Sequence, residues 1–97
     1  MDGLYEFNIK SPMGNIKALV KLIPNGNILS GYIDVMGKRS EFNNGVIQGN
    51  NLSLKGNFSA GMMKIQYTIM GNVNGNILNL SAQTNMGNFN LQGHKIS

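Results

Sequence analysis

Residues 63–82 read MKIQYTIMGNVNGNILNLSA, with apolar side chains at every second position before Asn74-Gly75-Asn76 and again after it. Successive side chains of a β-strand point to opposite faces, so each run predicts a strand with one buried face. The Asn-Gly pair between the runs favours positive φ, and we expect a tight type I′ turn there. The stretch therefore predicts a β-hairpin with one apolar face.

The same period of two recurs along the whole chain. Turns rich in glycine and asparagine separate the alternating runs, and no long segment has the apolar spacing of a helix. We therefore predict an all-β protein with no helix longer than two turns. The expected strands are approximately residues 3–10, 15–23, 27–36, 38–48, 51–58, 62–72, 76–84 and 87–96.

Two kinds of turn alternate between these strands. The odd-numbered turns carry methionine near glycine, at Met13, Met36, Met62-Met63 and Met86. The even-numbered turns carry Gly-Asn, at 25–27, 49–51 and 74–76. Antiparallel neighbours reverse direction at each turn, so turns of one kind meet at one end of the molecule. We predict an antiparallel up-and-down meander of about eight strands that closes into a small barrel, with the methionines at one end.

The chain also contains an internal repeat. Residues 11–36 align with residues 60–85, and both segments contain Asn-Gly-Asn-Ile-Leu, at 25–29 and 74–78. We interpret residues 1–97 as a single β-barrel domain built from two pseudo-repeats, like a duplicated half-barrel.

The order of the turn motifs resembles that of a group of small bacterial β proteins of unassigned function. The motifs that carry the resemblance are Ser-Pro-Met-Gly at 11–14, a Gly-Asn turn, Met-Gly at 36–37, the methionine-rich fifth turn and Gly-x-Phe-x-Leu-x-Gly at 87–93. That group is similar in architecture to lipocalin-like, calycin-type barrels. The resemblance implies the barrel fold and a cavity, and it carries over no catalytic residue.

Composition excludes several classes of function. The chain has no cysteine and one histidine, so we expect no disulfide, no thiol nucleophile and no metal site. Its net charge is +4, but the cations are scattered, and we expect no nucleic-acid partner. The N-terminal residues do not have a signal-peptide pattern, and no apolar run reaches the roughly 18 residues of a membrane span. We expect a cytoplasmic protein with no membrane span and no cofactor.

The methionine end has three interpretations. The side chains plug the barrel, line a mouth for an apolar ligand, or form a surface for self-association, for example a homodimer. An eight-stranded barrel is just wide enough for its own side chains or for one small ligand. By the strand phase, Ala18 and Ala82 face inward and leave room, whereas Lys17 faces outward. The interior half near the methionines is predicted to contain Ile9, Ile16, Ala18, Ile33, Val35, Phe42, Phe58, Ile65, Ala82 and Phe89.

Tyr67 is an inward-facing polar residue, between Ile65 and Ile69. A buried phenol needs a hydrogen-bond partner, which is either a ligand atom or the backbone or a water. Our leading hypothesis is a barrel that binds a small apolar or aromatic molecule through its methionine-rimmed end. The alternatives are an enzyme that uses the same cavity with Tyr67 as its polar or acid group, and an interaction or oligomerisation module. The predicted ligand-binding residues are Met13, Met36, Phe42, Phe58, Met63, Ile65, Tyr67, Met86 and Phe89.

Overall fold

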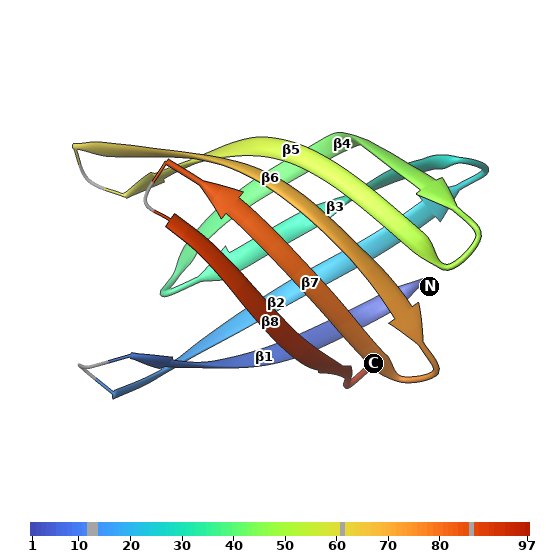
Figure 1. The fold of residues 1–97 in the computed structure, drawn as a ribbon, viewed down its shortest axis with the longest axis horizontal. Helices are drawn as coiled ribbons and strands as arrows, with labels where there is room; N and C mark the ends of the chain where they lie inside the picture. Colours follow the sequence, from blue (N-terminus) through green and yellow to red (C-terminus); the bar gives the residue numbers. More distant parts are fainter. Residues whose placement is uncertain (12–13, 61, 86) are drawn as a thin grey trace.

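The computed structural model is a closed barrel of eight antiparallel strands in sequential order (Figure 1). It describes residues 1–11, 14–60, 62–85 and 87–97, and for residues 11, 58, 60 and 63 it describes the backbone alone. The strands are β1 (Gly3–Ser11), β2 (Gly14–Asn25), β3 (Ile28–Val35), β4 (Lys38–Gln48), β5 (Asn51–Ala60), β6 (Met63–Asn74), β7 (Ile77–Thr84) and β8 (Gly87–Lys95). The predicted fold class, meander and closure are confirmed, and the described residues contain no helix.

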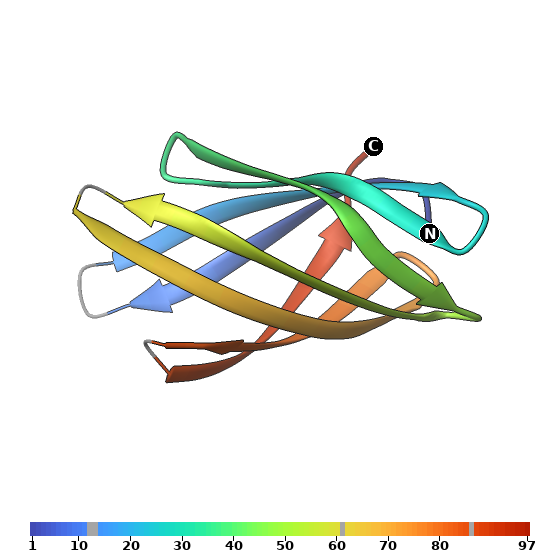
Figure 2. The same cartoon turned by 90° about the horizontal axis from the view of Figure 1, so that it is seen from above.

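Alternate connections lie at opposite ends of the barrel (Figures 1 and 2). The ends of β1, β3, β5 and β7 and the starts of β2, β4, β6 and β8 form the odd end, at the left of both views. The β2–β3, β4–β5 and β6–β7 connections and both termini lie toward the even end. Met36 and Met62 lie in connections of the odd end, as predicted, whereas Met13 and Met86 are outside the described residues.

The even-end connections are two-residue Gly-Asn loops. Their glycines, Gly26, Gly49 and Gly75, have φ values of 62°, 61° and 64°. Among the described residues, Met36 is the one non-glycine with positive φ, so the asparagines of these loops do not have it. Positive φ at the first central residue alone is the pattern of a type II′ turn. The predicted type I′ turn is wrong because β2 and β6 continue through the asparagine and place glycine first in the loop.

Backbone hydrogen bonds hold these three loops against the next strand. The carbonyl of the asparagine in each loop accepts an N–H: Asn27 from Ile47 at 2.9 Å, Asn50 from Val73 at 2.9 Å and Asn76 from Lys95 at 2.8 Å. Each bond extends the ladder of the adjacent hairpin into the turn. Backbone hydrogen bonds therefore join neighbouring strands at the even end as far as the tips of the loops.

Two of the eight strand interfaces are paired over only three residues each. β4 pairs with β5 from Val46–Ser53 to Gln48–Asn51, and β1 pairs with β8 from Tyr5–Lys95 to Phe7–Gly93. The other six interfaces have seven to ten paired residues. The barrel therefore consists of two four-stranded sheets, β1–β4 and β5–β8, whose ladders join in the even half.

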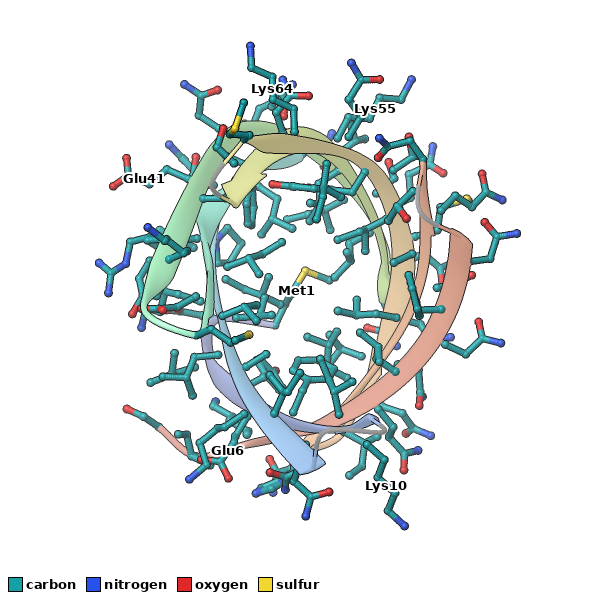
Figure 3. All side chains as sticks on the ribbon, turned by 90° about the vertical axis from the view of Figure 1, so that its left-hand side faces the viewer. Met1, Glu6, Lys10, Glu41, Lys55 and Lys64 are labelled. Atoms are coloured by element: carbon teal, nitrogen blue, oxygen red, sulfur yellow. The ribbon has the colours of Figure 1, made fainter. Side chains whose placement is uncertain are left out.

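The even half of the interior is closely packed. Its largest fully buried side chains are Tyr5, Phe7, Leu22, Leu29 and Leu78. Gly93 makes room for the Phe7 ring, since a Cβ at that position would lie 2.6 Å from Phe7 Cζ. Met1 lies near the barrel axis in Figure 3, and its carbonyl accepts a hydrogen bond from the Tyr5 hydroxyl at 3.4 Å. Burial, with a contribution from the Asp2 carboxylate, raises the pKa of the Tyr5 phenol above its usual value.

The predicted inward and outward faces hold on β2, where Ala18 is buried and Lys17 is exposed. On β4 the alternation breaks at a bulge opposite β3. Phe42 and Gly45 are both buried, with two exposed asparagines between them. A bulge adds one residue to one strand, so the residues after it have the opposite inward and outward phase. The bulge accounts for the weak apolar alternation in this part of the sequence.

Candidate functional site

The odd half of the interior contains an apolar pocket of about 390 Å³. Its residues come from both sheets and lie close to the odd-end connections, from which Figure 3 views the barrel. The lining residues are Ile9, Ile16, Ile33, Val35, Ile65, Tyr67, Ile69, Ala82, Thr84, Phe89 and Leu91. The polar atoms of these residues do not contribute to the accessible wall of the pocket. The wall is therefore made of hydrocarbon groups.

One row of cross-strand neighbours shows how the space arises. Ile69 of β6 pairs with Ala82 of β7, which pairs with Phe89 of β8. Directly paired side chains lie on the same face of a sheet, within reach of one another. The methyl group of Ala82 therefore leaves a gap between two larger side chains. Phe89 is 49% exposed, which places it toward the mouth of the pocket.

The hydroxyl groups of the lining residues bond to protein atoms. Tyr67 Oη lies 3.0 Å from Ser40 Oγ, and Ser40 Oγ donates to the Asn57 carbonyl at 2.8 Å. Because the one hydroxyl proton of Ser40 is used in that bond, Tyr67 donates to Ser40. Thr84 Oγ1 donates to the Gly87 carbonyl at 2.7 Å. These bonds explain why the tyrosine and threonine offer only carbon atoms to the pocket.

Ser40 is the hydrogen-bond partner of Tyr67 that the sequence reasoning missed. It is 7% exposed, and it bridges β4 to β5 and β6 where the β4–β5 ladder has ended. A Cβ on Gly56 would overlap the Tyr67 hydroxyl, so this glycine makes room for the phenol. The signal was present in the sequence: Ser40 is two residues before Phe42, and so on the same inward face.

The nine predicted ligand-binding residues have different outcomes. Ile65, Tyr67 and Phe89 line the pocket. Phe42 is buried beside Gly31, outside the described lining, and Met36 is 75% exposed at the tip of the β3–β4 turn. The side chains of Phe58 and Met63, and the whole of Met13 and Met86, lie outside the described residues.

A second, more open groove of about 800 Å³ lies on the outer face of β5–β8. A row of amide side chains crosses it. Asn79 Nδ2 donates to Asn72 Oδ1 at 3.2 Å, and Gln92 Nε2 donates to Asn79 Oδ1 at 3.0 Å. These amides bond to one another across the strands, as side chains on the solvent face of a sheet do. We therefore take the interior pocket as the candidate site.

Charged side chains are distributed unevenly around the odd end. Lys17 pairs with Glu6 at 3.8 Å, and Arg39 pairs with Asp34 at 3.3 Å. The Arg39 guanidinium also lies 3.9 Å from the centre of the Tyr32 ring. Among the described side chains, three lysines near this end form no ion pair: Lys10, Lys38 and Lys64.

The described part of the chain contains no cluster of three or more metal-ligating side chains. It also contains no helix long and apolar enough to cross a membrane. No family model, curated protein or solved structure matches the chain. The observed architecture, an eight-stranded closed antiparallel barrel, is consistent with a calycin-like fold.

Proposed function

We propose that this protein binds a small apolar or aromatic molecule in the pocket, which the molecule enters from the odd end. The observation that supports the proposal is a pocket of about 390 Å³ whose wall is made of hydrocarbon groups. Pockets for small ligands are mostly apolar and have volumes of about 300–1,000 Å³. The sequence also led us to expect a lipocalin-like protein located in the cytoplasm, and we include both expectations in this proposal.

The hydration of the pocket supports binding. A buried water needs two to four polar partners, and the described lining residues expose no polar atom to the pocket. Water in the pocket is therefore poorly held, and an apolar ligand that displaces it gains free energy. A polar group of the ligand would have to lie at the mouth, where solvent and the rim residues can solvate it.

An enzyme that uses Tyr67 is the alternative function. The phenol would have to break its hydrogen bond to Ser40 and turn into an apolar space, which leaves the Ser40 hydroxyl with one partner fewer. A group that acts on a substrate has to reach it at hydrogen-bonding distance. Because the Tyr67 hydroxyl is directed away from the pocket, we favour binding over catalysis.

Uptake of the neutral dye phenylnaphthylamine, measured by fluorescence titration, tests the proposal. Ala82→Phe fills the gap between Ile69 and Phe89, and we expect it to weaken dye binding by about tenfold or more. Ser81→Phe is the matched control, because Ser81 is the adjacent position on the outer face. Tyr67→Phe should leave uptake unchanged, since the hydroxyl does not reach the pocket.

Circular dichroism and thermal melting establish that each variant is folded. Equal dye affinity in folded Ala82→Phe and folded Ser81→Phe would place the dye elsewhere and overturn the proposal. Native mass spectrometry of the protein purified from its own host then shows the mass of any bound molecule and the number of protein copies.

A further inference from the structure

Two methionines at the odd end are exposed at the tips of connections. Met36 is 75% exposed and Met62 is fully exposed. Met62 lies in the β5–β6 connection and Met36 in the β3–β4 turn, so the two side chains come from different sheets. Side chains this exposed contribute little packing to the fold, and neither methionine lines the pocket.

The backbone of Met36 is unfavourable for its residue type. Val35 pairs with Lys38, and the two residues between them, Met36 and Gly37, have φ values of 54° and 78°. Positive φ at both central positions is the type I′ pattern, in which asparagine, aspartate and glycine are preferred. A methionine there is held in the left-handed region, which side chains other than glycine rarely adopt. Such strain, in a residue that packs little, points to a role outside folding.

Lysine side chains accompany these methionines. Lys10 is the second-to-last residue of β1, Lys38 begins β4 directly after the Met36 turn, and Lys64 is the second residue of β6. Figure 3 shows Lys10 and Lys64 projecting outward around this end of the barrel. The acidic side chains Glu6 and Asp34 are already paired with Lys17 and Arg39. Among the described side chains at this end, one carboxylate forms no ion pair, that of Glu41 on β4, against the three lysines. The odd end therefore combines exposed apolar tips with an excess of positive charge.

We infer that the odd end docks on the surface of an anionic lipid bilayer. Met36 and Met62 insert at the boundary between headgroups and acyl chains, and the three lysines contact the lipid phosphates. Surface-bound proteins combine apolar insertion with attraction between lysines and anionic lipids. The charge also argues against a second copy of this chain as the occupant, since two odd ends face to face would bring the same lysines together.

The even end differs in where its exposed apolar side chains lie. Its exposed apolar side chains, including Ile28 and Val46, lie on the outer faces of paired strands. The tips of its loops carry Gly-Asn. Ile28 therefore offers a matched control: it is 52% exposed, apolar and remote from the proposed docking surface.

Cosedimentation of the full chain with vesicles tests the inference. We expect binding to vesicles of equal parts phosphatidylcholine and phosphatidylglycerol, little binding to phosphatidylcholine alone, and loss of binding at high salt. Lys38→Gln and Lys64→Gln should each weaken partitioning by about fivefold. Met36→Asn should weaken it by about tenfold and still fold, because asparagine suits the turn. Met62→Ser tests the second tip independently.

Several results would overturn the docking inference. Equal binding to both vesicle types would remove the role of anionic lipid, and equal loss in Ile28→Thr and Met36→Asn would remove the role of the odd end. A dimer in light scattering that Met36→Asn dissociates would assign the surface to self-association. The inference does not depend on a pocket ligand, so a folded Ala82→Phe variant should dock like the wild-type protein.

Discussion

The even and odd ends of the barrel are built from the same strands but differ in turn chemistry and in packing. At the even end, glycine occupies the positive-φ position of each loop, and asparagine carbonyls tie the loops to the next strand. At the odd end, Met36 occupies such a position and is exposed. Inside, the even half contains the fully buried side chains, and the odd half contains the pocket.

This difference indicates that, within one small domain, the even half mainly stabilises the fold and the odd half provides the candidate site. Close packing and backbone hydrogen bonds stabilise the even half. The ladders between the two four-stranded sheets are confined to that half, so the odd half is joined across these seams by side chains such as Ser40. Binding surfaces are commonly drawn from the less stable parts of a fold. We therefore expect the more stable half of the barrel and the candidate site to lie at opposite ends.

The largest expected effect concerns core packing in the two halves. Leu78 is fully buried in the even half, and Leu78→Ala should lower the free energy of unfolding by about 2–5 kcal/mol. Ile65 borders the pocket and is partly buried, so Ile65→Ala leaves less new cavity and should cost about half as much or less. Urea denaturation followed by circular dichroism measures both values.

The comparison of the two halves depends on how the loss in free energy of unfolding for Ile65→Ala compares with the loss for Leu78→Ala. If Ile65→Ala proves as destabilising as Leu78→Ala, the odd interior is as closely packed as the even one. The inference that the even half provides most of the stability is then wrong. An unchanged dependence of the unfolding free energy on urea in both variants ensures that the same two states are compared.

The second prediction concerns the side-chain bridge across the β4–β5 seam. Ser40→Ala removes the partner of the buried Tyr67 hydroxyl and should lower the free energy of unfolding by about 1–3 kcal/mol. Adding Tyr67→Phe removes the hydroxyl left without a partner, so the double variant should be more stable than Ser40→Ala alone. A double-mutant cycle by urea denaturation measures the coupling. Additive effects would show that the two hydroxyl groups do not act as a bridge.

Most of the fold was predictable from the sequence, because a period of two is a local signal and a meander follows from short turns. The main errors arose at the turns. At Asn25-Gly26 the pair predicted a type I′ turn, but the strand extends through the asparagine and a type II′ pattern results. The bulge in β4 was also missed, because whether two successive asparagines both face solvent depends on pairing with β3.

The candidate site was predictable in part. Strand phase alone placed Ile9, Ile33 and Ala82 in the odd interior, and all three line the pocket. Phe42 faces the interior as predicted, but its ring fills the space beside Gly31 and is not among the described lining residues of the pocket. Strand phase did not identify Ser40 as the partner of Tyr67, since the two residues meet only when strands distant in sequence curve around the barrel. The proposed duplication of the half-barrel stays a prediction.

The smallest expected effects compare one turn from each end and have opposite signs. Gly75 has a φ of 64° and open space around a Cβ, so Gly75→Ala adds backbone strain alone and should lower the free energy of unfolding by about 1–2 kcal/mol. Met36→Asn relieves strain and should raise it by up to about 1 kcal/mol. Thermal melting resolves the two shifts. A lower melting temperature for Met36→Asn would mean that Met36 stabilises the fold, and backbone strain would then no longer support docking.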